Sequence, residues 1–165
     1  MKFLKALMWG SFILYLLVLG TLLFVSSRHG YLVYDYTFAE KLRYNANFVP
    51  FATISDYITA YQNQTLNTDI IVRNLGGNLI AFTPFGLFLP LLFEKLRKIG
   101  PFLIVFISIL TGIEVTQLLT VRGSFDVDDF ILNIPSALIG WGIFHLDSKV
   151  WANWRYGEVV NDEIH

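Results

Sequence analysis

Residues 101–146 read PFLIVFISILTGIEVTQLLTVRGSFDVDDFILNIPSALIGWGIFHL, which is two long apolar runs separated by a charged turn. The turn contains Arg122, Asp126, Asp128 and Asp129. A bilayer core of about 30 Å needs roughly 20 mainly apolar residues per helix, so the two runs predict two membrane helices joined by a short loop. Ionisable groups inside a membrane helix are unfavourable by about 3 kcal/mol or more unless paired or hydrated, so this turn is a candidate functional site.

Two further apolar runs complete the pattern, and the full set is about 4–26, 75–93, 101–121 and 130–146. Hydrophobic residues make up 55% of the 165 residues and charged residues only 15%, whereas soluble domains have about 25% charged residues. The sequence therefore predicts an all-α, membrane-spanning bundle of four transmembrane helices. The last run is short, so we expect it to include Phe125 or to end in flanking residues that reach the interface.

The first run begins with Lys2 and Lys5 and stays apolar to Val25. A cleaved signal peptide also starts with positive charges, but its apolar core has about 7–15 residues and precedes a small-residue cleavage site. Here the apolar run is longer, and Phe-Val-Ser-Ser-Arg28 offers no clear site of that kind. We therefore expect a first helix that is retained.

The short loops differ in positive charge, which predicts the orientation in the membrane. The loop 94–100 contains three cations, whereas 122–129 contains only Arg122. With lysines also at the start of the chain, both termini are expected in the cytoplasm. The loops 27–74 and 122–129 are then extracytoplasmic.

We expect a membrane domain at 1–146 and a cytoplasmic tail at 147–165, in which Trp151 and Trp154 can anchor at the inner interface. The chain contains no cysteine, which excludes disulfides, thiolate metal sites and cysteine nucleophiles. The sequence has no basic run of the kind that binds nucleic acid. The four apolar runs make the lipid bilayer the predicted partner.

The long loop is expected to contain a short helix at 53–62. Thr53 occupies the position of an N-cap, and Asp56 lies in the first turn. One apolar face follows from three- and four-residue spacing of Ile54, Tyr57, Ile58 and Tyr61. Two interpretations remain open, a helix lying in the membrane interface and a helix packed on a small core of the loop itself.

Polar residues mark one face of three membrane helices at the end expected to be extracytoplasmic. Spacings of three, four and seven place side chains on the same face. The residues are Asn74 and Asn78 on the second helix, Glu114 and Gln117 on the third, and Asp126, Asp129 and Asn133 on the fourth. Each would be unsatisfied in hydrocarbon, so we expect them to converge on a shared pocket in which Arg73 and Arg122 neutralise two carboxylates. The alternative is a network that only joins helices, at about 0.6–2 kcal/mol per group.

Individual residues also have simpler interpretations. Asp126 is expected to cap the fourth helix, because an acid at a helix N-terminus accepts backbone N–H bonds. Asp128 is expected to face water. The pair Gly76-Gly77 should allow close approach of helices. Helix kinks are expected at Pro84, Pro90 and Pro135.

Several motifs occur in a distinctive order: Asn47-Phe-Val-Pro-Phe51 with Thr53-Ile54, Asn74-Leu-Gly-Gly-Asn78, Phe82-Thr-Pro-Phe-Gly86 with Pro90, Glu114-x-x-Gln117, and Arg122 with Phe125-Asp-Val-Asp-Asp129-x-x-x-Asn133. In these motifs the chain resembles the VanZ-like family of bacterial membrane proteins, over about 43–146. Where that family continues the last asparagine with threonine and glycine, this chain has Ile134-Pro135-Ser136. The resemblance therefore does not settle how closely the fourth helix packs, although Gly140 remains.

The resemblance implies a protein of the bacterial cytoplasmic membrane with a role in the cell envelope, including low-level resistance to teicoplanin-type glycopeptide antibiotics. The leading hypothesis is a protein that binds or modifies a lipid headgroup, a lipid-linked wall precursor or a glycopeptide. Arginines would hold phosphate through charge-assisted bonds, and amides would recognise hydroxyl or amide groups. The ligand-binding candidates are Arg43, Asn47, Arg73, Asn74, Asn78, Glu114, Gln117, Arg122, Asp126, Asp129 and Asn133.

Two other hypotheses are open. The chain could be a membrane enzyme acting on a lipid-linked substrate, with Glu114, Asp126 and Asp129 as the catalytic and metal-binding candidates. These acids would hold a divalent cation, the one cofactor considered, or act as acid and base. A small transporter is less favoured, because the acids lie near one end of the helices rather than at the midplane.

Overall fold

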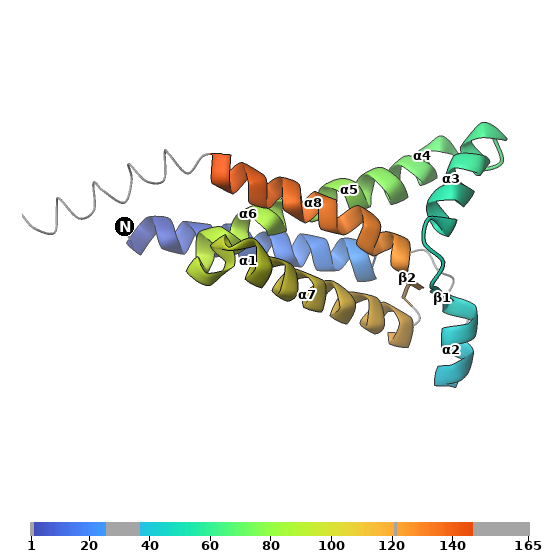
Figure 1. Ribbon diagram of the computed structural model, residues 1–165, viewed down its shortest axis with the longest axis horizontal. Helices are drawn as coiled ribbons and strands as arrows, with labels where there is room; N and C mark the ends of the chain where they lie inside the picture. The colour runs from blue at the N-terminus through green and yellow to red at the C-terminus, as the bar shows by residue number, and fades with distance from the viewer. Residues whose placement is uncertain (1, 26–36, 121, 147–165) are drawn as a thin grey trace, which may run out of the picture.

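The computed structural model describes residues 2–25, 37–120 and 122–146. Four apolar helical segments in it are long enough to cross a membrane (Figure 1). They are α1 (Lys2–Phe24), the run Thr68–Leu92, α7 (Ile99–Thr120) and α8 (Val127–Leu146). The predicted all-α class with four spans is confirmed.

The second span is not one regular helix. It consists of α4 (Thr68–Ile71), the π-helix η1 (Val72–Gly76), α5 (Gly77–Ala81) and α6 (Thr83–Leu92). Asn67 caps its start by accepting the backbone N–H of Asp69, so it begins earlier than the apolar run at 75. Hydropathy alone did not detect the first turns of this span, because they are polar. π-helical turns are frequent at functional sites, and this one places Asn78 in the turn that follows it.

Two glycines let α6 and α8 cross backbone against backbone. A Cβ atom built on Gly86 would lie 1.9 Å from the carbonyl oxygen of Ala137, and one on Gly140 would lie 1.9 Å from that of Thr83. The close approach expected at Gly76-Gly77 is wrong, because added Cβ atoms there meet no other helix within 4 Å. The fourth helix therefore packs closely despite the departure at Ile134-Pro135-Ser136.

Aromatic rings fill the interior between α6 and α7. Phe102 and Phe106 are fully buried, and the ring of Phe106 lies 5.6 Å from that of Phe82. The first helix joins this core through Phe12, and the hydroxyl of Tyr15 donates to the carbonyl oxygen of Ala81 at 2.8 Å. The membrane helices thus form one packed unit.

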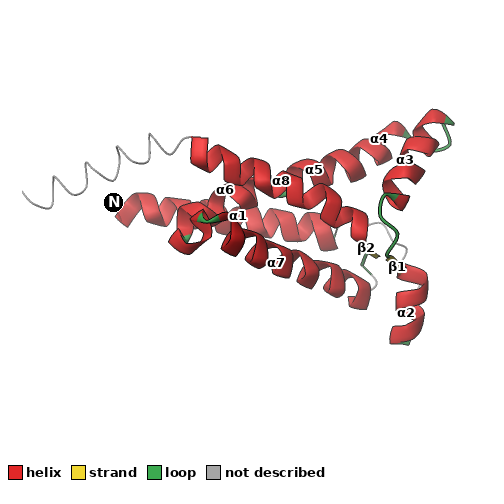
Figure 2. Ribbon diagram, in the orientation of Figure 1, coloured by secondary structure: helices red, strands yellow, loops and turns green. Residues whose placement is uncertain are grey.

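Residues 37–67 lie across one end of the bundle, which we call the loop end (Figure 2). It contains α2 (Phe38–Asn45), β1 (Ala46–Asn47) and α3 (Ala52–Gln62). Strand β1 pairs in parallel with β2 (Phe125–Asp126), which precedes α8. At the other end, the 3₁₀ turn η2 (Glu94–Arg97) connects α6 to α7, and we call this the η2 end.

Helix α3 agrees with the predicted range 53–62, but its cap was predicted wrongly. The N-cap residue is Phe51, in the left-handed region with φ 65°, and its side chain makes no capping bond. Thr53 lies inside the first turn, and its hydroxyl donates a hydrogen bond to Asp126. No residue of α3 is buried, so the described residues show no separate loop core beneath it. The tail 147–165, with Trp151 and Trp154, lies outside the described residues.

Candidate functional site

Polar side chains from the loop and from three membrane helices meet at the loop end. Hydrogen bonds or electrostatic contacts connect each of them to at least one other member. We call this set the polar cluster, and its members are Asn47, Thr53, Asn78, Glu114, Asp126, Asp128 and Asp129.

Asp126 is the centre of the polar cluster. Its Oδ1 accepts the backbone N–H of Asp128 at 2.9 Å, which is the predicted capping bond of α8. The same carboxylate receives the amide of Asn47 at 3.1 Å and the hydroxyl of Thr53 at 2.5 Å. Its own backbone N–H donates to Glu114 at 3.1 Å. Asp126 therefore caps a helix and ties the loop to the membrane bundle at once.

Asp128 was expected to face water, and that expectation is wrong. It is 1% exposed, and its carboxylate accepts the backbone N–H groups of Phe51 at 2.5 Å and Ile54 at 3.0 Å. The first N–H groups of a helix have no partner within the helix. Asp128 supplies that partner for α3, and its negative charge lies at the positive end of the helix dipole.

Asp129 and Glu114 form a pair of acids within the polar cluster, one on α8 and one on α7. The amide of Asn78 donates to Asp129 Oδ1 at 2.5 Å and joins α5 to α8. The side chains of Glu114 and Asp129 interact directly. Glu114 is 2% exposed, so α7 brings a buried acid to a second acid on α8.

Asn133 lies on α8 one helical turn beyond Asp129. It follows Asp129 by four residues on α8, and helical side chains lean toward the N-terminus, so it points along the same face toward Asp129. It is 3% exposed, and its side-chain oxygen has no hydrogen-bond partner among the described residues. Buried polar atoms are nearly always hydrogen-bonded, so this oxygen stands out.

Other predicted site residues lie apart from the polar cluster. Gln117 is buried, and its amide donates to the carbonyl oxygen of Leu23 at 3.1 Å, which joins α7 to α1. The side-chain amide of Asn74 donates to the carbonyl oxygen of Ile70 in the same span at 2.7 Å. The sequence could not show this, because spacing fixes a face but not a side-chain rotamer.

The three arginines of the predicted site lie in different surroundings. Arg43 is exposed, with its guanidinium 6.0 Å from the ring centre of Tyr44. Arg73 is exposed, and within the described residues it forms no ion pair with an acid. Arg122 lies half-buried in the turn before β2, and its backbone N–H donates to Gln117 at 3.0 Å. The predicted neutralisation of cluster carboxylates by Arg73 is therefore not observed.

Tyr57 belongs beside the polar cluster and was not predicted there. It lies half-buried on α3, and burial, followed by the negative charges of Asp129 and Asp126, raises the pKa of its phenol. The sequence showed that Tyr57 lies on the apolar face of the predicted helix. It did not show which part of the protein that face would contact.

The acids were also metal-binding candidates. Within the part of the chain that the structure describes, no three histidine, cysteine or acidic side chains are arranged as a metal-binding group. The carboxylate of Asp126 already accepts three hydrogen bonds from protein groups. The carboxyl groups of Glu114 and Asp129 can exchange protons and accept hydrogen bonds.

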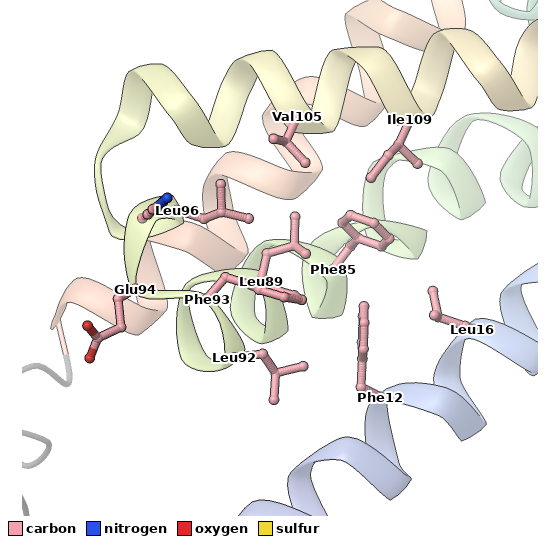
Figure 3. A pocket seen from close by; sticks show the side chains of 11 residues that line it. Phe12, Leu16, Phe85, Leu89, Leu92, Phe93, Glu94, Leu96, Val105 and Ile109 are labelled. Atoms are coloured by element: carbon pink, nitrogen blue, oxygen red, sulfur yellow. The ribbon is translucent and has the colours of Figure 1, made fainter.

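A cavity of about 890 Å³ lies toward the η2 end, away from the polar cluster (Figure 3). Apolar side chains of α1, α6 and α7 line it, among them Phe12, Phe85 and Ile109, together with Glu94 and Lys95 of η2. A second, polar cavity of about 540 Å³ lies at the turn between α3 and α4. Neither is lined by members of the polar cluster.

Comparison with known proteins identifies the family of the chain. The sequence profile of the VanZ/LLP1 family matches residues 12–148, which includes every helix that contributes to the polar cluster. No curated protein and no solved structure matches the chain.

Proposed function

This chain belongs to the VanZ/LLP1 family, and from that premise we propose that it binds a cell-envelope ligand at the polar cluster. The family and the four apolar helices make it a VanZ-like multi-pass membrane protein. The proposed ligand is a lipid headgroup, a lipid-linked wall precursor or a glycopeptide. The proposed role is a contribution to low-level resistance to teicoplanin-type antibiotics in the bacterial cytoplasmic membrane.

The proposed orientation places the loop end outside the cell. Lys95 and Lys98 flank α7 at the η2 end, and Lys2 and Lys5 begin α1. Cations concentrate on the cytoplasmic side of membrane proteins. Both termini are then cytoplasmic, and the polar cluster faces the compartment in which wall precursors and glycopeptides are found.

The observation that carries the proposal is the convergence of acids and amides from α5, α7, α8 and the loop at one point. A network that only joined helices would need one or two polar groups. The bonds of Asp126 and Asp128 hold the loop in place, so part of the polar cluster is structural. Glu114, Asp129 and Asn133 retain acceptor oxygens beyond those bonds, which supports a binding role for them.

Susceptibility testing checks this proposal. The wild-type gene and its Glu114→Gln and Asp129→Asn variants are expressed in a susceptible Gram-positive host, and the inhibitory concentration of teicoplanin is measured. We expect the wild type to raise that concentration and both variants to lose the effect at equal membrane abundance. Asp56→Asn, an exposed acid on α3, is the matched control. Full protection by both variants would refute a binding role for the acids.

A second candidate, a membrane enzyme, is favoured by one observation. Glu114 and Asp129 interact directly from facing helices, and two adjacent carboxyl groups in different environments are a common acid–base arrangement. A divalent cation at these acids is part of the same candidate. Stabilisation of the purified protein by magnesium or manganese that disappears in Glu114→Gln would favour it, whereas equal stabilisation of both proteins would exclude the cation.

A further inference from the structure

Among the described residues, no cation forms an ion pair with Glu114 or Asp129. Glu114 Oε2 receives the backbone N–H of Asp126, and Asp129 Oδ1 receives the amide of Asn78. No N–H of the described residues donates to the second oxygen of either carboxyl group, and the two carboxyl groups lie within hydrogen-bonding reach of each other. The other charged groups that act on the pair are the carboxylates of Asp126 and Asp128. The local field therefore favours a positive ligand.

The oxygen of Asn133 is an independent indication. It is an acceptor, it is buried, and no hydrogen bond reaches it within the described chain. It lies one helical turn beyond Asp129, on the face that α8 turns to the acid pair. An unpaired acceptor at this depth is strongly unfavourable, so its presence beside two acids indicates a donor that the protein does not supply.

The three groups together select one chemistry. A primary ammonium has a positive charge and three N–H donors and no acceptor, which matches the unpartnered oxygen of Asn133 and the carboxyl oxygens of Glu114 and Asp129 beside it. A phosphate would meet the negative charge of the acids here. A quaternary ammonium has the charge but no N–H to give. The exposed positions of Arg43 and Arg73 also place phosphate contacts outside this set.

We propose that Glu114, Asp129 and Asn133 form a binding site for a primary ammonium group. This inference rests on the proposed binding function and names the chemistry of its ligand. The ammonium comes either from a phospholipid headgroup of the ethanolamine type or from a soluble amine, such as an amino sugar. The start of α8 lies at the level of the loop, where a headgroup would be within reach of Asp129 from the bilayer surface.

The test compares two lipids that differ in the N–H donors of the headgroup. The full-length protein is placed in nanodiscs of phosphatidylglycerol with increasing phosphatidylethanolamine or phosphatidylcholine, and the shift of the thermal unfolding midpoint gives an apparent affinity. We expect ethanolamine lipid to stabilise the wild type and choline lipid to have much less effect. Soluble ethanolamine or glucosamine, added to pure phosphatidylglycerol nanodiscs, forms the second arm and identifies a soluble source if it alone stabilises.

Variants connect the effect to the site. Asn133→Leu removes the amide oxygen at similar volume, and we expect about tenfold weaker apparent binding of the ammonium. Asn133→Asp keeps an acceptor and adds negative charge, so binding of the ammonium should be strengthened. Asn74→Leu is the matched control, since that amide bonds to its own helix. Because Asn133→Asp predicts the opposite change, poor folding of the leucine variant leaves the test intact.

Two outcomes would overturn the inference. One is equal stabilisation of the wild type by the ethanolamine and choline lipids with no effect of soluble amines. The other is unchanged ammonium binding in both Asn133 variants. If either occurs while Glu114→Gln still abolishes antibiotic protection, the binding function stands and only the ammonium chemistry is wrong. If protection is also unaffected, both proposals fail.

Discussion

Replacing Asp128 with asparagine should release α3 from the membrane bundle. The carboxylate accepts two backbone N–H groups, at 2.5 and 3.0 Å, from Phe51 and Ile54. An asparagine keeps one acceptor oxygen and loses the charge. The loss of one hydrogen bond to a charged group is worth about 1.5–3 kcal/mol, and the loss of an anion at a helix N-terminus about 0.3–1 kcal/mol more.

A change of about 2 kcal/mol or more in loop docking corresponds to roughly a 30-fold shift in its equilibrium. Amide hydrogen exchange reports such local opening directly. In nanodiscs, we expect the amides of Ala52–Gln62 to lose protection by about that factor in Asp128→Asn, while α7 and α8 stay protected. Asp56→Asn is the same substitution at an exposed position of α3 and should leave protection unchanged. Equal protection of α3 in Asp128→Asn and wild type would refute the capping role.

Three further predictions test other parts of the structure. Gly140→Ala places a Cβ atom 1.9 Å from a carbonyl oxygen of α6, so the free energy of unfolding, measured by thermal melting, should fall by about 1–3 kcal/mol. Gly142→Ala is the control, because a Cβ atom there has nothing within 4 Å, and it should be nearly neutral in the same assay. The raised pKa of Tyr57 means that the docked loop holds the phenolic proton more tightly than the free loop. Docking should therefore be constant below the ordinary tyrosine pKa of about 10 and weaken above it; limited proteolysis of the loop across this pH range should show the step in wild type and not in Tyr57→Phe. Gln117→Leu removes the amide that donates to α1 at 3.1 Å and should raise proteolytic release of α1 by several-fold, for a bond worth about 1 kcal/mol, with unchanged protection of α3.

The sequence was sufficient for the membrane bundle and for much of the polar cluster. Hydropathy is a local property, and a bilayer needs long apolar segments, so four spans could be read directly. Periodicity placed Asp129 and Asn133 on one face of α8, and the capping preference of acids placed Asp126 at its start. Each of these inferences uses residues within two turns of one another.

The structure added what depends on distant segments. Asp128 caps a helix whose contacts lie 77 positions away along the sequence, and a two-residue strand such as β1 has no detectable sequence pattern. The choice between glycine pairs also depends on packing: Gly86 and Gly140 meet backbone of another helix, whereas Gly76 and Gly77 do not. Side-chain contacts separate the two asparagines, because the amide of Asn74 donates to Ile70 of its own span whereas the amide of Asn78 donates to Asp129.

The account depends on the loop being joined to the start of α8, and one cross-linking measurement tests this directly. Ala46 and Phe125 are partners in the parallel β1–β2 pair, and adjacent strands lie about 4.8 Å apart, within the Cα separation of a disulfide. The chain has no cysteine of its own, so Ala46→Cys with Phe125→Cys needs no further substitution. We predict rapid disulfide formation in native membranes under mild oxidant and none for Ala46→Cys with Gly100→Cys at the η2 end. No disulfide between positions 46 and 125, although both thiols react with a maleimide, would contradict the account.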